Sequence, residues 1–208
     1  MNFVFIFVFG LLFSFVSAMP PGPINMGVSH WIYTKQFSKI NWFLFGVILT
    51  DVLIANIAIG SLVLSNLPHE IFRVIGLFGG AFFILFGIYG LFKRNVQSDV
   101  IQNKDTILKH KIGFFLRGVL FCGLNPGFFL FWIFVAVFII KPDSIFSFYS
   151  HIVYSMGIIL GNTVWFFLFF QMIKIAKNKI SYYYWKIVSH LLIFLFGILS
   201  LVRVFLHA

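Results

Sequence analysis

Long apolar stretches alternate with short polar segments along the whole chain. A helix that crosses the hydrocarbon core of a bilayer needs about 20 mostly apolar residues. Six stretches reach that length, at 3–33, 41–65, 70–92, 113–140, 147–173 and 184–206. The pattern therefore predicts an all-α integral membrane protein with six transmembrane helices, built as a single transmembrane domain over residues 1–208.

Two of these stretches are longer and contain residues that break helices. The first carries Pro20-Pro21-Gly22-Pro23, and the fourth carries Asn125-Pro126-Gly127. Proline removes a backbone donor and clashes with the preceding turn. Non-helical backbone at membrane depth persists only where it is buried in protein or lines a polar cavity. We therefore expect helices 1 and 4 to be unwound in their middle, next to a polar site.

Composition excludes a soluble protein. Hydrophobic residues make up 61% of the chain and charged residues 10%, and the mean hydropathy is +1.04, whereas soluble domains are nearer half apolar and a quarter charged. A net charge of +10 would suit nucleic acid in a soluble protein, but here the basic residues lie in short segments between apolar stretches. The expected partner is the lipid bilayer, not nucleic acid.

The placement of the basic residues predicts the orientation in the membrane. Lysine and arginine concentrate in segments that stay on the cytoplasmic side. Twelve of them flank the ends of stretches one, three and five, against three on the opposite side, Arg73, Lys141 and Arg203. We predict a multi-pass protein of the cell inner membrane, with both termini extracytoplasmic and a cytoplasmic loop at 93–112. The first stretch lacks the basic segment of a signal peptide, so we expect it to be retained.

The second half of the chain repeats features of the first. Besides the breaks, the matching segments are Gly46–Asp51 (GVILTD) with Gly157–Asn162 (GIILGN), and Leu85–Ile88 with Leu195–Ile198 (both LFGI). The three matches follow the same order and have nearly equal offsets along the chain. They predict two repeats, at about 1–95 and 112–208. Because each repeat has three spans, the second enters from the opposite side, an inverted arrangement typical of transporters with alternating access.

Asp51 is the one acidic residue that lies deep inside an apolar stretch. A charge there costs about 2.5–3.5 kcal/mol on insertion scales and normally faces the bundle interior or a wet cavity. The position suits a carboxyl that exchanges a proton or cation, or that receives a substrate ammonium group. The alternative is a structural carboxyl bonded to unwound backbone. Asn162, at the equivalent position of the second repeat, has no titratable charge, which suggests one coupling carboxyl per transporter.

The two breaks are candidates for substrate binding. The N-termini of the half-helices 24–33 and 128–140 favour a carboxylate through their free N–H groups and the helix dipole. Unwound carbonyl groups suit the opposite end of a zwitterion, and Asn25 and Asn125 can both donate and accept hydrogen bonds there. The alternative is a pair of kinks that serve packing only.

Other residues point to packing. Cys122 is the only cysteine, so we expect neither a disulfide nor a Cys-based metal site. Gly157 and Gly161 are expected to let helices approach closely, and Trp31 to anchor a span end at the membrane interface. His190 lies near a span end without helical spacing to another ligand. We expect no metal site, no cofactor and no enzyme active site.

These motifs resemble those of the lysine exporter family, amino-acid translocators that include the homoserine and threonine resistance proteins. The resemblance covers the whole chain and includes its length, the six spans and the acidic residue in span two. The matching residues are Pro21, Gly22, Pro23, Asp51, Asn125 and Pro126. The resemblance implies export of amino acids or related solutes driven by the proton gradient. The family commonly has a lysine after the Asn-Pro pair, where this chain has Gly127.

The sequence thus predicts a secondary transporter that exports an amino-acid-like solute by proton antiport. The expected transport-site residues are Pro21, Gly22, Pro23, Asn25, Asp51, Asn125, Pro126, Gly127 and Asn162. The expected partners are a small-molecule substrate (an amino acid), the proton as coupling ion and the bilayer, while a homo-oligomer stays open. The alternatives are efflux of another small solute or of a metal cation, for which a lone carboxylate is a poor ligand set, and a non-transporting membrane scaffold.

Overall fold

The computed structural model describes residues 2–20, 23–64, 69–92, 111–139, 147–175 and 180–206. Within these ranges the ordered elements are all helices, and no strand occurs. The helices are α1 (Phe3–Ala18), α2 (Pro23–Tyr33), α3 (Phe37–Leu64), α4 (His69–Phe92), α5 (Lys111–Gly123), α6 (Pro126–Ile139), α7 (Phe148–Ile175) and α8 (Ile180–Leu206). Pro21, Gly22 and most of the expected cytoplasmic loop, 93–110, lie outside the described residues.

The helices cover the six apolar stretches of the sequence. At both expected breaks one helix ends and another begins, so α1 and α2 divide the first stretch and α5 and α6 the fourth. Helices α3 and α8 each begin four residues before the predicted start. By length and apolarity α3 and α7 can each cross a membrane, and the α5–α6 pair, bent by 59°, is a third candidate among the described residues.

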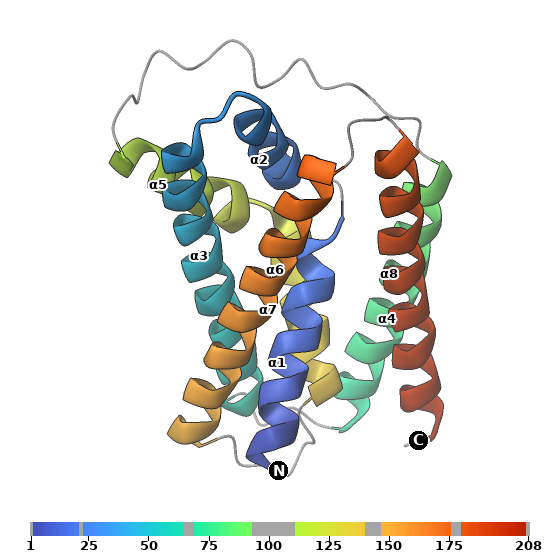
Figure 1. The fold of residues 1–208 in the computed structure, drawn as a ribbon. Coiled ribbons are helices and arrows are strands. Elements are labelled where there is room, and N and C mark those ends of the chain that lie inside the picture. The colour runs from blue at the N-terminus through green and yellow to red at the C-terminus, as the bar shows by residue number, and fades with distance from the viewer. Residues whose placement is uncertain are drawn as a thin grey trace.

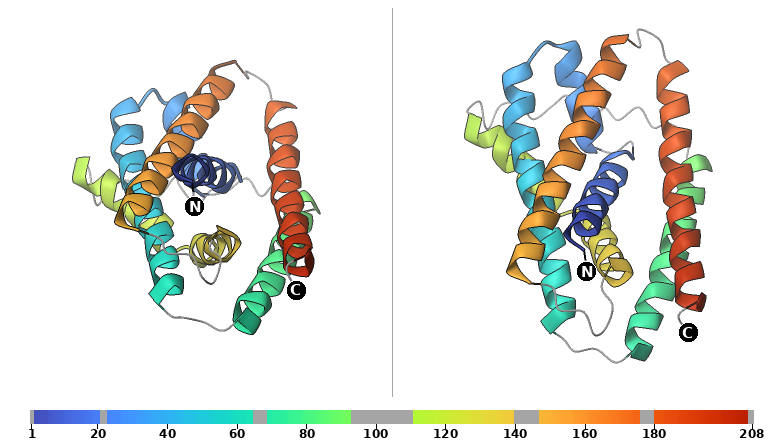
Figure 2. Two further views of the ribbon diagram at one scale, coloured as in Figure 1. Left: turned by 90° about the horizontal axis from the view of Figure 1, so that it is seen from below. Right: turned by 60° about the horizontal axis from the view of Figure 1, so that its bottom comes forward.

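The helices form two outer pairs around a central pair. Viewed from below, α1 and α6 run nearly end-on through the middle, with α3 and α7 on one side and α4 and α8 on the other (Figure 2). The closest pairings are α1 with α7, α4 with α8, and α3 with α5. Figure 1 shows that α2 and α5 both lie in the upper part of the bundle. The broken helices therefore meet between the outer pairs.

Glycines bring α1 and α7 into direct backbone contact. A Cβ atom added to Gly157 would overlap the carbonyl oxygen of Phe7, and one added to Gly10 would overlap that of Tyr154. Gly161 is held in the same way against α1. The expectation that Gly157 and Gly161 permit close helix approach is confirmed, because any side chain at these positions would separate the helices.

Helices α3 and α5 cross in the same way. A Cβ atom added to Gly46 would overlap the carbonyl oxygen of Phe115, and one added to Gly118 would overlap that of Phe43. Each of these four residues has a counterpart in the α1–α7 crossing: Gly10 for Gly118, Phe7 for Phe115, Gly157 for Gly46 and Tyr154 for Phe43. The two crossings thus use the same positions, and α3 is aligned with α7 in the register that also aligns Asp51 with Asn162.

The α4–α8 pair contains a third close contact of this kind. An added Cβ at Gly87 would lie 2.9 Å from the carbonyl oxygen of His190, and one at Gly197 would lie 2.8 Å from that of Gly80. In the register that aligns the two LFGI segments, Gly87 matches Gly197 and Gly80 matches His190. The contact of Gly87 with the residue-190 backbone therefore matches the contact of Gly197 with the residue-80 backbone.

The two second half-helices are packed very differently. Helix α6 packs closely against α3 and α4, and its Trp132, Val135 and Ala136 are fully buried. Helix α2 makes only light contacts with α3, α5 and α7. Gly27 on α2 is buried, yet no atom lies within 4 Å of a Cβ built on it. A small side chain would therefore find room at Gly27 of α2.

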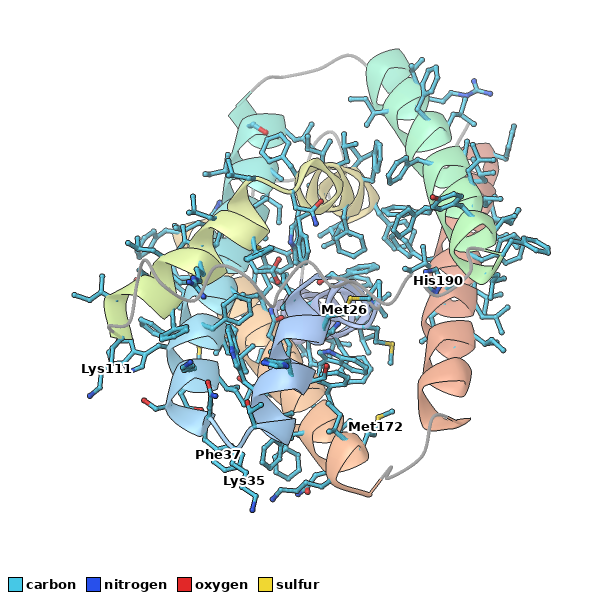
Figure 3. All side chains as sticks on the ribbon, turned by 90° about the horizontal axis from the view of Figure 1, so that it is seen from above. Met26, Lys35, Phe37, Lys111, Met172 and His190 are labelled. Atoms are coloured by element: carbon cyan, nitrogen blue, oxygen red, sulfur yellow. The ribbon has the colours of Figure 1, made fainter. Side chains whose placement is uncertain are left out.

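The two ends of the bundle differ in charge. The lysines whose side chains are described, Lys35, Lys39, Lys111 and Lys174, lie at the α2–α3 turn, the starts of α3 and α5, and the end of α7. These segments are at the upper end in Figure 1, whereas α1 begins and α8 ends at the lower end. Figure 3 looks down on the upper end, where Lys35 and Lys111 point outward. One end is basic, and the other carries both chain ends.

Candidate functional site between the broken helices

Asn25 closes the first break. Its Nδ2 group donates to the carbonyl oxygens of Ala18 at 2.7 Å and Pro20 at 2.9 Å, and its Oδ1 accepts from Trp165 Nε1 at 3.3 Å. The last carbonyl groups of a helix lack intrahelical partners, so the amide satisfies the end of α1 from within α2. Both amide hydrogens are engaged. Asn25 therefore holds the break and ties it to α7, rather than offering a donor to a ligand.

Asn125 has a different task at the second break. Its Oδ1 accepts from the backbone N–H of Gly127 at 3.0 Å, and its carbonyl accepts from Phe128 N–H at 3.0 Å. This is the N-cap arrangement, and Pro126 occupies the first helical position, where the missing donor costs nothing. The side chain of Asn125 thus caps α6, as that of Asn25 closes α1.

Asp51 lies between α6 and α7 and is completely buried. Its Oδ1 accepts from Trp132 Nε1 at 2.6 Å, and its Oδ2 accepts from Asn162 Nδ2 at 2.7 Å. An ionised carboxylate is an acceptor only, so the two N–H donors match that form. The pair predicted to be equivalent by sequence, Asp51 and Asn162, is thus in direct contact, on the helices α3 and α7.

A cavity of about 300 Å³ lies next to this pair and joins the two breaks. Its polar lining residues are Ser17, Asn25, Asn125, Asn162 and His190. Phenylalanines from the four helices α4, α5, α6 and α7 form most of the remaining wall. Asp51 does not line the cavity. Asn162 does, and it is the hydrogen-bonded link between the buried carboxyl and the cavity.

Both second half-helices begin at the cavity. Ile24 and Asn25 of α2 and Gly127 and Phe128 of α6 all line it, so the helix N-termini point toward the same space. Pro23 and Pro126 are the first residues of these helices. Of the residues predicted for the site, Asn25, Asn125, Gly127 and Asn162 line the cavity, and Asp51 lies one hydrogen bond behind it.

Three residues of this region were missed by sequence reasoning. His190 was predicted near a span end, but it lies well inside α8, is 6% exposed and lines the cavity. Trp132 and Trp165 were not considered. A buried indole N–H needs an acceptor, so a tryptophan deep in an apolar stretch of a chain with one buried carboxyl was a usable signal.

A second polar cluster joins α3 and α7 away from the cavity. Asn56 donates from Nδ2 to Ser155 Oγ at 2.9 Å and to the carbonyl oxygen of Val52 at 2.8 Å. His151 Nδ1 lies 2.8 Å from Asn56 Oδ1. Since both amide hydrogens are engaged, Oδ1 accepts from an N–H at Nδ1. The cluster fastens the two helices at the end that carries the chain termini.

A family model for the LysE type translocators matches residues 15–204, which is most of the chain. The chain belongs to this family. The predicted resemblance to lysine exporters is thereby confirmed. The chain matches no curated protein and no solved structure.

Members of the LysE type translocator family are transporters and not enzymes. They move amino acids or similar small solutes across membranes. The apolar helices of this chain agree with a protein embedded in a membrane.

Proposed function

We propose that this LysE type translocator exports an amino acid or an amino-acid-like solute by proton antiport. The observation that carries the proposal is the double role of Asn162, which lines the cavity and donates to the buried Asp51. Through it, a proton on the carboxyl changes what the cavity offers to a solute. The coupling ion and the substrate thus meet at one side chain.

The proposed framework is six spans in two inverted three-helix repeats, 1–95 and 112–208. Two observations support this framework. The glycine contacts between α1 and α7 recur at matching positions between α5 and α3, and the α4–α8 contact uses matching positions on its two helices. Three spans per repeat reverse the direction of the second copy, and a contact between Asp51 and Asn162 is expected where equivalent residues meet on a pseudo-two-fold axis.

In the proposed orientation the basic end of the bundle faces the cytoplasm and both chain ends face outward. Basic residues favour the cytoplasmic side, and the described lysines gather at the upper end in Figure 1. Helix α2 then lies on the cytoplasmic side of the cavity and α6 on the outer side. The loose packing of α2 and the tight packing of α6 suit a state that opens inward.

Proton uptake has a definite effect on the Asp51 site. Trp132 Nε1 can only donate, and Asn162 donates from Nδ2 to both Asp51 Oδ2 and the carbonyl oxygen of Ile158, at 2.7 Å and 3.3 Å. A proton on Oδ2 would face a second donor. The conflict is relieved when the Asn162 amide turns over, so that its Oδ1 accepts the new O–H.

The turn changes the wall of the cavity. With Asp51 ionised, Asn162 presents its oxygen to the cavity, and an ammonium group is attracted by both this oxygen and the carboxylate behind it. With Asp51 protonated, the amide presents NH₂ and the negative charge is gone, so the ammonium group is released. One proton entering from outside thus exchanges for one solute leaving, as antiport requires.

The test is efflux of preloaded, labelled amino acids from proteoliposomes under an imposed pH gradient. Asp51→Asn should abolish gradient-driven flux but keep exchange of labelled for unlabelled solute, because the cavity remains and only the titratable group is lost. Gradient-driven flux that survives Asp51→Asn would contradict the role of the carboxyl.

The same efflux assay, repeated with other small solutes and with metal cations, tests the alternative substrates. The described residues contain no group of three or more His, Cys, Asp and Glu side chains that could hold a metal ion, which favours the amino-acid panel. Flux of no panel member by the wild-type protein would favour a non-transporting scaffold.

A further inference from the structure

We propose that the basic end of the bundle binds the phosphate headgroups of anionic membrane lipids. The binding surface, here called the lysine patch, consists of Lys35, Lys39, Lys111 and Lys174. None of these residues lines the transport cavity, so lipid binding is independent of the solute and of the coupling ion.

No described carboxylate balances the positive charge of the lysine patch. Its members lie at the α2–α3 turn, at the starts of α3 and α5, and at the end of α7. Asp51 is the one acidic residue whose side chain the structure describes, and it is completely buried between α6 and α7. A cluster of four or more basic residues next to membrane helices is typical of binding to anionic lipids.

Two lysines of the patch lie over phenyl rings. Lys174 Nζ is 4.3 Å from the ring centroid of Phe170, and Lys39 Nζ is 5.1 Å from that of Phe114. An ammonium group is attracted to the face of an aromatic ring, while its alkyl chain covers apolar surface and the charge stays at the water boundary. The rings therefore hold both ammonium groups in place before a ligand arrives, which lowers the entropy lost on binding.

Exposed aromatic side chains indicate that this end lies at the level of the lipid headgroups. Phe37, at the start of α3, is 44% exposed and lies edge-on to Phe170, with ring centroids 5.8 Å apart. Trp42 is 38% exposed on the same helix, about one turn from Lys39. Exposed aromatic rings are enriched where the hydrocarbon core meets the headgroups. The lysine patch thus lies next to the polar part of the lipids.

The backbone of Lys35 independently points to a use for its charge. Among the described residues it is the one non-glycine residue with a positive φ, at 56°. Its N–H donates to the carbonyl oxygen of Ile32 at 3.1 Å, and the N–H of Gln36 donates to that of Trp31 at 2.8 Å. Glycine is the usual residue at such a helix end, because a side chain is unfavourable in the left-handed conformation. A lysine kept in this conformation is explained by a need for its ammonium group.

The patch fits a lipid better than a small anion in solution. Lys35 and Lys111 lie apart at the rim of the bundle and point outward (Figure 3), so they face the surrounding membrane and not a shared pocket. A phospholipid offers its phosphate to the lysines and its acyl chains to the exposed rings of Phe37 and Trp42. A free phosphate ion would gain only the first of these contacts.

The test measures the binding of phosphatidylglycerol and of phosphatidylcholine to the full-length protein in detergent, by native mass spectrometry. The wild-type protein should prefer phosphatidylglycerol, which is anionic. Replacing each lysine of the patch by glutamine should lower this preference about fivefold, the contribution of one basic residue near an anionic surface. Lys35→Gly should lower the preference in the same way, yet raise the thermal unfolding temperature in phosphatidylcholine nanodiscs, since glycine suits the left-handed backbone.

Arg73→Gln is the matched control. Arg73 is exposed near the start of α4, at the opposite end of the bundle (Figure 1), and its replacement should leave the lipid preference unchanged. Equal binding of the two lipids by the wild-type protein would overturn the inference, as would a preference that survives the replacement of all four lysines in a folded protein. Thermal stabilisation by inorganic phosphate as large as that by phosphatidylglycerol would also overturn it, because the ligand would then be the free ion.

Discussion

Helices α1–α4 and α5–α8 share their close contacts but not their polar groups. Both halves use glycines at matching positions, where α1 crosses α7 and α5 crosses α3. At other matching positions the two halves carry different side chains. The comparison teaches that the repeated small residues determine how the helices cross, while the polar residues near the cavity differ between the two halves.

Three matching pairs of positions carry different residues, and two of the pairs contribute one residue each to the cavity wall, Asn162 and His190. Asp51 corresponds to Asn162, Gly80 to His190 and, in the register that aligns the two breaks, Gly27 to Trp132. In the last pair, the buried side chain of Trp132 lies next to the Asp51 carboxyl, whereas no atom lies within 4 Å of a Cβ built on Gly27. The matching helix contacts thus surround unlike side chains, and in the proposed exchange Asp51 would be the one residue that takes up the proton.

The largest effect, on proton-driven efflux, is expected from exchanging the residues at positions 51 and 162. Asp51→Asn combined with Asn162→Asp moves the carboxyl to the matching position of the other half. Proton-driven efflux should return to within about tenfold of the wild type, a deficit that corresponds to losing the Trp132 hydrogen bond to a charged group. Asp51→Asn alone should show none. The measurement is gradient-driven efflux from proteoliposomes.

Equal inactivity of the exchanged protein and the single variant, with both folded as judged by size-exclusion chromatography, would show that the two positions are not interchangeable. The carboxyl would then need the hydrogen-bond donors that surround position 51, and the matching position 162 could not replace it.

A smaller effect is expected from filling the shared glycine contacts. Gly118→Ala should lower the stability by about 1–3 kcal/mol, because the new methyl group overlaps backbone of α3 and overpacking costs this much. Gly27→Ala is the control. It should leave stability unchanged or slightly raised, since its Cβ meets no atom and alanine favours helix. Thermal unfolding in detergent micelles checks both, and similar losses in the two variants would contradict the packing described for α2.

The smallest effect concerns the cluster of Asn56, His151 and Ser155. Its matching positions are apolar, namely Phe167, Ile40 and Leu44. Asn56→Leu should therefore cost only about 0.6 kcal/mol, the mean found for polar contacts between membrane helices, and transport should persist. Thermal unfolding of this variant and of His151→Phe would measure how much the cluster contributes to the free energy of unfolding. A loss of more than about 2 kcal/mol, beyond the usual maximum for such contacts, would mean that it does more than fasten α3 to α7.

Features that depend on local sequence were predictable. The breaks follow from proline chemistry, and the glycine contacts of α1 with α7 follow from small-residue spacing. The equivalence of Asp51 and Asn162 was predicted from sequence, but their hydrogen bond was not, although such a contact is expected where equivalent residues of a proposed inverted repeat meet.

Features that depend on which helix faces meet were not predictable. His190 was interpreted as a residue near a span end because nothing in α8 itself shows that this face borders a cavity. The interpretation of Trp31 as an interfacial anchor was wrong, since it is 5% exposed and packs edge-on against Phe43 and Phe114. Asn25 was expected at the break, but its use in closing α1 depends on the path of the chain between Ala18 and Pro23.

The two indoles that hold the polar groups of the site are also chromophores. Trp132 donates to Asp51 and Trp165 donates to Asn25, and both are almost fully buried. The emission of an indole responds to the charge beside its ring nitrogen, so a proton on Asp51 changes the field at Trp132 while Trp165 reports on the first break. The protein therefore carries its own optical probes of proton uptake and of movement at α2, with no added label.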